Sequence, residues 1–448
     1  MGSVTLSRWT MAYFAAALAA LVLAEGLMAA GYGYPAAALK APETLILVHI
    51  VAIGWLSLLM CGALFQFVPV LTARPLHNDS IPLPALVCLV TGLAALVLGF
   101  LQLAGHVQPD APVFPLAAGL LGLGFGLTVW DLGRTLWAAR PLPLPARFVA
   151  VGLFSIGSTA TFGIVFALVF GNVTTYPHFI DVTARGLPIH AIAGLGGWLT
   201  FTAMGVSYRL LAMFMLAPDL DRGTTRGVLY AGTLALALVI LGGAAAICFG
   251  GGLMGIIGAG GLLGLGAVAL YGRDILHLYR ARKRRTIELN SRVAAIALAN
   301  LAAAILLAAA LLALGIFERS IAAPVFLLAF GWLSGLGLGK LYKIVAFLTW
   351  LECYGPVLGK TATPRVQDLV VEGRAVKWFA FYFLAVWSAT AALLFGWSSA
   401  FQGACFIMMI GTGGIIMQLA RIRILADVTG SLRLPAGARQ PRLLLSRT

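Results

Sequence analysis

Long apolar stretches alternate with short polar segments along almost the whole chain. Each apolar stretch has about 20 residues or more, the length of helix that crosses the hydrocarbon core of a bilayer. Proline and glycine punctuate the junctions between the stretches. The pattern predicts an all-α integral membrane protein with about twelve transmembrane helices. The predicted spans are 10–31, 44–71, 82–104, 112–137, 147–170, 187–217, 227–249, 252–272, 292–316, 323–351, 375–396 and 399–425.

Three of these spans, the second, sixth and tenth, share a sequence motif. Each copy begins with Gly-Trp-Leu, has a second glycine eight residues after the first, and has an aromatic residue three further on. A polar or cationic residue then follows the aromatic one. Small residues allow close helix packing, and this alone could account for the glycines. The three copies begin at Gly54, Gly197 and Gly331, have second glycines at Gly62, Gly205 and Gly339, and end in Gln66, Arg209 and Lys343.

The spacing of the motif predicts how the spans are grouped. The copies lie roughly 140 residues apart, about four spans, and all run in the same direction through the membrane. This predicts three parallel four-helix units with pseudo-threefold symmetry about an axis along the membrane normal. The units cover about 1–140, 141–285 and 286–425 of a single transmembrane domain, 1–448, and 426–448 forms a basic tail.

Composition supports the membrane assignment and excludes a large soluble protein. Hydrophobic residues make up 61% of the chain and charged residues only 10%. Soluble domains have about 45–50% apolar and about 25% charged residues, because their surface faces water. The five cysteines are scattered among apolar segments, which argues against a disulfide framework and against a cysteine-based zinc site.

The net charge of +15 has a topological explanation. Most of the 30 Lys and Arg residues fall on one side of the twelve predicted spans, including the long loop 273–292 and the tail 426–448. The positive-inside rule places that side, with both termini, in the cytoplasm. The predicted partner of this surface is the lipid bilayer, and nucleic-acid binding is not needed to explain the charge.

Two of the six histidines occupy similar positions in related spans. His49 and His190 enter the membrane near the outer ends of spans two and six, shortly before the Gly-Trp-Leu motif. Neutral imidazole is a ligand for haem iron and for copper, and a polar group facing lipid is costly. The sequence therefore makes His49 and His190 candidate metal ligands. The alternative is that each imidazole only bonds a neighbouring backbone carbonyl.

The twelve spans, the parallel repeats and the segment from His49 to Pro69 resemble the catalytic subunit of haem–copper oxidases and nitric oxide reductases. The chain is also similar to the NnrS family of bacterial membrane proteins. The resemblance implies haem or copper as cofactors, a small diatomic gas, a metal or an anion as ligand, and the bacterial inner membrane as location. The chain departs from the oxidase pattern, since predicted spans seven and ten contain no histidine. A single His49 also stands where the NnrS motif has two histidines. The full dinuclear centre of the oxidases therefore cannot form.

Ionisable residues inside the spans are further candidates, because burying a charge in lipid is expensive. Glu25, in the outer half of span one, is predicted to orient His49 or pair with it. Arg209 and Lys343 are repeat equivalents near the cytoplasmic side, where with Gln66 they would bind an anion such as a haem propionate. The alternative is that the two basic side chains only extend to the interface.

Two functions follow from these features. The first is a haem- or copper-associated membrane protein that acts in nitric oxide or respiratory-metal physiology without the complete oxidase ligand set. The second is a transporter that moves a small solute or ion past Glu25, Arg209 and Lys343. No phosphate-binding loop, dinucleotide-binding glycine pattern or nucleophile elbow is present in a convincing context, so the sequence assigns no catalytic reaction.

Overall fold

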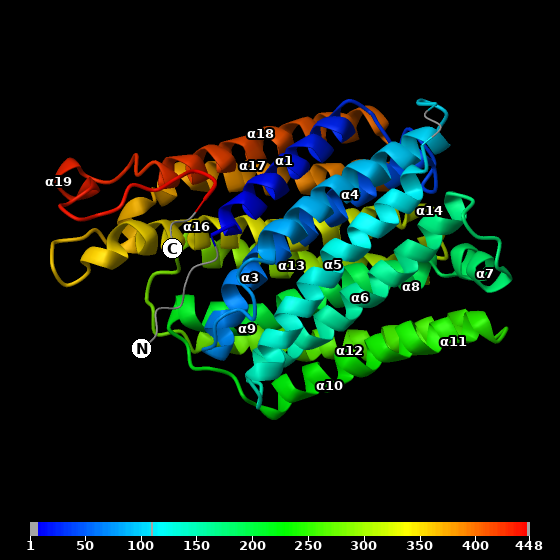
Figure 1. Ribbon diagram of the computed structural model, residues 1–448, viewed down its shortest axis with the longest axis horizontal. Coiled ribbons are helices and arrows are strands. Elements are labelled where there is room, and N and C mark those ends of the chain that lie inside the picture. Colours follow the sequence, from blue (N-terminus) through cyan, green and yellow to red (C-terminus); the bar gives the residue numbers. More distant parts are fainter. Residues whose placement is uncertain (1–7, 109–110, 446–448) are drawn as a thin grey trace. The chain divides into compact units, whose positions relative to one another are not determined.

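The computed structural model describes residues 8–108 and 111–445, and in these residues all regular secondary structure is helical (Figure 1). This part of the chain contains twelve helical spans that are long and apolar enough to cross a membrane, so the protein is a multi-pass membrane protein, as predicted. Eight spans are single helices: α1 (Thr10–Ala29), α4 (Pro82–Leu103), α5 (Val113–Ala138), α6 (Leu144–Phe170), α12 (Leu253–Arg280), α13 (Leu289–Ala313), α17 (Glu372–Phe395) and α18 (Ser398–Arg423).

The other four spans are each built from consecutive helical segments. Span Pro42–Thr72 consists of α2 (Pro42–His49), η1 (Ile50–Ser57) and α3 (Leu58–Thr72), and span Leu187–Met215 consists of α8 (Leu187–Ala191), η2 (Ile192–Phe201) and α9 (Thr202–Met215). Span Gly223–Cys248 consists of α10 (Gly223–Ala237), η3 (Leu238–Gly242) and α11 (Gly243–Cys248), and span Ala322–Val357 consists of α15 (Ala322–Phe326), η4 (Leu327–Ser334), α16 (Gly335–Tyr354) and η5 (Gly355–Val357). Short helices outside the spans are α7 (Pro177–Arg185), α14 (Phe317–Ser320), η6 (Val366–Leu369) and α19 (Gly430–Arg433).

The chain folds as two compact units. One comprises residues 63–286, where α4, α5 and α6 pack in sequence, α6 packs on η2 and α9, and α10 packs on α12. The other comprises the described residues up to 62 together with those from 287 onward. There α17 lies beside α18, α1 packs on η1 and α18, and α13 packs on η4 and α16 (Figure 1). Both units bury large aromatic side chains, including Trp198 and Tyr271 in the first and Trp55, Trp332 and Tyr382 in the second.

The repeated motif has the same local packing in all three copies. The second glycine of each motif lies against the helix that begins the same predicted repeat: Gly62 against Tyr13 of α1, Gly205 against Phe148 of α6, and Gly339 against Val293 of α13. A Cβ atom at Gly62 would lie 2.5 Å from Tyr13 Cβ, and one at Gly339 would lie 2.6 Å from Val293 Cγ1. The glycines therefore allow close helix contact. The division into three units and their pseudo-threefold symmetry stay predictions.

The end of α12 and the start of α13 differ from the sequence expectation. Helix α12 continues to Arg280, where the apolar pattern predicted an end at residue 272, and α13 begins at Leu289 instead of residue 292. The charged side chain of Asp274 does not end α12, because it is buried and accepts hydrogen bonds from Tyr208 (3.0 Å) and Thr224 (2.5 Å). The expected long loop 273–292 is therefore only 281–288.

Candidate functional site

The three copies of the motif lie in π-helical segments. Gly54-Trp55-Leu56 is in η1, Gly197-Trp198-Leu199 in η2 and Gly331-Trp332-Leu333 in η4. Short π-helical segments are rare and are frequently found at functional sites, because the wider turn leaves backbone carbonyls without their usual α-helical partners. The tryptophans of the three segments are at most 1% exposed. The sequence repeat is thus matched by a repeated irregularity of the backbone.

Side chains bond the carbonyls of η4. The carbonyls of Ala329, Phe330 and Gly331 accept hydrogen bonds from Ser334 Oγ (2.8 Å), Tyr382 Oη (2.9 Å) and Asn300 Nδ2 (3.1 Å). Buried carbonyls need such partners, and lipid provides none. Two neighbouring helices, α13 and α17, therefore stabilise the widened turn.

A tryptophan of the first motif is bonded to the third. Trp55 Nε1, in η1, donates to Ser334 Oγ in η4 at 2.7 Å. Both serines that follow Gly-Trp-Leu donate back over five residues, Ser57 to Ala52 and Ser334 to Ala329. Residues far apart in sequence thus form one buried polar cluster in the second compact unit.

His49 lies at the junction of α2 and η1, and its side chain is partly buried. Its Nδ1–H donates to the Leu45 carbonyl one helical turn earlier, at 2.7 Å. This bond sets the ring orientation and places the proton on Nδ1, so Nε2 is the nitrogen with ligand chemistry.

His190 occupies the corresponding place in the sixth span, two residues before η2. Its Nδ1–H donates to the Thr159 carbonyl of α6 at 3.1 Å, and its ring packs against Phe166 with centroids 5.3 Å apart. The two histidines therefore share both their position before a π-helical segment and their hydrogen-bond type. The bond from each imidazole to a backbone carbonyl is the one that the alternative prediction from the sequence describes. A histidine that binds a metal through its other ring nitrogen makes the same kind of bond.

Clusters of metal-binding side chains are absent from the described residues. In 8–108 and 111–445, no group of three or more His, Cys, Asp or Glu side chains is placed to hold a metal ion. Copper sites usually need two or three such ligands, whereas haem iron can be held by one histidine. The predicted haem or copper cofactor stays a prediction.

Glu25 is completely buried in α1. Its Oε1 accepts a hydrogen bond from Thr412 Oγ1 of α18 at 2.8 Å, and in the described part of the chain its Oε2 has no hydrogen-bond partner. The hydrogen bond to the Glu25 carboxyl is therefore donated by Thr412. Its predicted role toward His49 stays a prediction.

Arg209, in α9, is paired with a carboxylate in the loop that follows this helix. Its Nη1 lies 2.8 and 2.6 Å from the two carboxylate oxygens of Asp219, and the side chains of Arg209 and Asp219 are 43% and 69% exposed. An exposed pair of this kind contributes little to stability. It also neutralises the charge that the predicted anion site would use.

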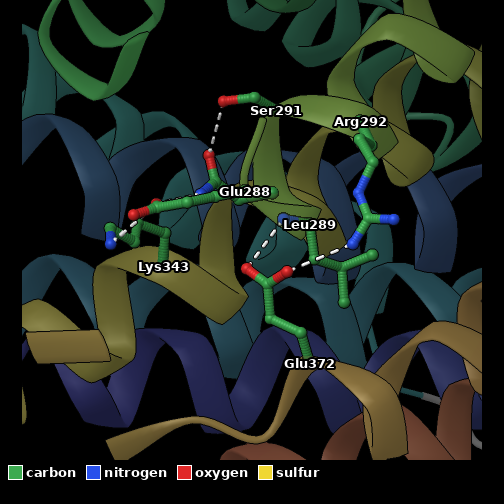
Figure 2. Close-up of polar contacts among 7 residues, drawn as sticks. Glu288, Leu289, Ser291, Arg292, Lys343 and Glu372 are labelled. Carbon is green, nitrogen blue, oxygen red and sulfur yellow. Dashed lines mark hydrogen bonds and ion pairs between the residues drawn. The ribbon is translucent and has the colours of Figure 1, made fainter. Parts of the chain in front are cut away.

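Lys343, the repeat equivalent of Arg209, is also paired. Its Nζ lies 2.8 Å from Glu288 Oε2, and the same oxygen accepts a bond from Asn290 at 3.0 Å (Figure 2). Both side chains of the ion pair are about 15% exposed. The role of Arg209 and Lys343 in binding an anion therefore stays a prediction, with a carboxylate already beside each of them.

The start of α13 is fixed by a second carboxylate. Glu372, the first residue of α17, accepts the backbone N–H of Leu289 at 2.8 Å and pairs with Arg292 at 3.1 Å (Figure 2). A carboxylate is favourable there because the first N–H groups of a helix have no partner within the helix. The contact connects α13 to α17.

Sequence reasoning missed a buried ion pair at the ends of α16 and α18. Arg423 Nη1 lies 3.0 Å from Glu352 Oε2, with side chains 4% and 0% exposed, and also donates to Thr349 Oγ1 at 2.9 Å. The sequence does contain a signal for a buried pair, because Glu352 and Arg423 are charged residues beside long apolar runs. In the sequence, Arg423 is one of many basic residues on the predicted cytoplasmic side, and nothing there pairs it with Glu352.

Asp427, just beyond α18, has two arginine partners. Arg421 Nη2 donates to its carboxylate at 2.6 Å and Arg374 Nη1 at 2.9 Å. The Arg421 hydrogen bond, with Arg374 assisting, holds the pKa of Asp427 below its usual value, although partial burial opposes this. Asp427 therefore carries its charge at neutral pH and connects the ends of α17 and α18.

Comparison with known proteins assigns no family. No protein-family model matches the chain, and no curated protein is significantly similar to it in sequence. The likeness to haem–copper oxidases and to NnrS therefore stays a prediction from the motifs.

Proposed function

We propose that this chain is a haem-binding membrane protein with His49 and His190 as the ligand candidates. One observation carries the proposal: each histidine lies one or two residues before a π-helical segment, and its Nδ1–H donates to a backbone carbonyl. Histidines that bind metals usually donate the other ring N–H to such an acceptor, which fixes the tautomer and the ring orientation. Bound haem would supply one-electron chemistry or a site for a small diatomic gas.

The test uses the full chain purified from bacterial membranes in cells supplied with a haem precursor. We expect a Soret band and stoichiometric haem in the wild type. At least one of the two variants His49→Ala and His190→Ala should lose the band while the protein stays inserted and folded, because one ligand contributes little to the lipid-facing surface. His178→Ala is the matched control, since His178 lies on the exposed helix α7, and it should keep the band. A colourless wild-type preparation would overturn the proposal.

A second candidate function is transport of a small solute or ion. It is favoured by Glu25, a fully buried carboxyl in a membrane span with one oxygen lacking a hydrogen-bond partner among the described residues. Such groups often mark ion or proton pathways. In proteoliposomes, Glu25→Gln should then abolish ion flux while His49→Ala leaves it intact. Flux that is equal in the wild type and in Glu25→Gln would exclude this role for Glu25.

A further inference from the structure

The chain after α18 folds back onto the ends of α16 and α18. The Arg439 N–H donates to the Cys353 carbonyl at 3.0 Å, and the Tyr354 hydroxyl donates to the Arg433 carbonyl at 2.7 Å. Arg423 Nη2 donates to the Arg442 carbonyl. Three bonds to backbone atoms therefore fix the path of the segment that the sequence predicted only as a basic tail. Its last residues, 446–448, lie outside the described residues.

This return and the end of α18 line an open cavity of about 380 Å³. Arg423, Ile424 and Leu425 line it together with tail residues that include Arg433 and Gln440. The volume lies within the range of small-molecule sites, about 300–1,000 Å³. The cavity is therefore large enough for a phosphate group with an organic substituent.

The charge of the lining is positive. The described residues that line the cavity include two arginines and no acidic residue. Arg423 is 4% exposed, and its Nε is buried without a hydrogen-bond partner in the described chain. Arg433 is held at the cavity by a bond from Nη2 to the Ile424 carbonyl, at 2.9 Å. Glu352 balances Arg423, and the nearby Asp427 is already paired with Arg374 and Arg421, so the charge of Arg433 is not compensated within the lining.

The cavity lies at the level of lipid headgroups. Helix α18 has 26 residues and a length of about 39 Å, which exceeds the hydrocarbon core of about 30 Å. Arg423 is its last residue, and the cavity begins there. A helix that crosses the core therefore places the cavity in the interfacial layer.

We infer that this cavity binds a phosphate group through Arg423 and Arg433. The guanidinium group matches phosphate oxygens in shape and charge, and the Gln440 amide provides a further donor. The phosphate belongs either to an anionic phospholipid or to a soluble phosphate compound. This site is independent of the proposed haem site, since it uses neither His49 nor His190.

The test compares Arg433→Gln with Arg439→Gln in delipidated full-length protein. Both variants remove one exposed tail charge, but only Arg433 lines the cavity. One arm titrates inorganic phosphate at constant ionic strength and follows the thermal midpoint. The other measures retention of phosphatidylglycerol from nanodiscs that also contain phosphatidylcholine. Arg433→Gln should weaken binding about tenfold or more, because a charge-assisted bond is lost, whereas Arg439→Gln should bind like the wild type.

The two arms separate the sources of the phosphate. Saturable stabilisation by inorganic phosphate that is lost in Arg433→Gln supports a soluble ligand. Selective retention of phosphatidylglycerol that is lost in the same variant supports a lipid. Equal loss in both variants would overturn the proposal, because tail charge alone would then explain binding. Absence of binding in both arms would also overturn it.

Discussion

Two tryptophans of the repeated motif differ in the hydrogen bonding of their indole N–H groups. Trp55 and Trp332 are both 0% exposed, but Trp55 Nε1 donates to Ser334 whereas Trp332 Nε1 has no partner among the described residues. Hydrogen bonds inside membrane proteins contribute about 0.6 kcal/mol on average. Trp55→Phe should therefore destabilise the protein by about 0.6 kcal/mol more than Trp332→Phe. Denaturation in mixed micelles would measure the difference, and equal losses would show that the indole bond does not stabilise the fold.

At the level of helices, the second glycine of each motif sets the approach of two spans. A Cβ atom at Gly205 would overlap Phe148 of α6, whereas one at Gly413 in α18 would meet no atom within 4 Å. Gly205→Ala should cost about 1–3 kcal/mol through overpacking. Gly413→Ala should be neutral or slightly stabilising, because alanine favours a helix. Thermal midpoints of the two variants test this, and the expectation fails if they shift alike.

Sequence periodicity predicted the spans well because their length and apolar content are set by the bilayer. All twelve predicted spans correspond to helices in the described residues. The end of α12 could not be predicted, since the partners of Asp274 come from residues 50 and 66 positions away. The Gly-Trp-Leu repeats were visible in the sequence, but the side chains of α13 and α17 that bond the π-helical turn of the third copy come from distant parts of the chain. The pairing of Glu352 with Arg423 was hidden for the same reason, as it joins separate helices.

For the whole molecule, the ion pairs of Asp427 at the start of α17 and the end of α18 should make the free energy of unfolding depend on pH in the acidic range. The pKa of Asp427 is lowered by Arg421 and Arg374, so its contribution is present above about pH 4, the range of an unfolded aspartate, and is lost as pH falls through the lowered pKa. Asp427→Asn should be less stable than the wild type at neutral pH, and this gap should shrink below about pH 4. Asp368→Asn, which removes a more exposed pair with Arg365, should show a smaller gap with the same direction of pH dependence, because solvent screens this pair. A gap for Asp427→Asn that stays constant between pH 7 and pH 3 would contradict the assignment.

The distribution of basic residues predicts the orientation of the whole chain. Reporter fusions after residue 285, in the loop 281–288, and at the C-terminus should both report the cytoplasm. A fusion in the loop that contains Lys40, between α1 and α2, should report the opposite side. An external C-terminus would contradict both the even number of spans and the predicted grouping into repeats.

The buried pair of Glu352 and Arg423 has a consequence for biosynthesis. The ribosome makes Glu352 roughly 70 residues before Arg423, and chains fold from the N-terminus during synthesis. Until the last span is inserted, α16 carries an acidic group without the arginine that balances it, and a buried charge without its partner is strongly destabilising. Chains cut short before residue 423 are therefore incompletely assembled at this helix, and membrane quality-control proteases should remove them faster than complete chains.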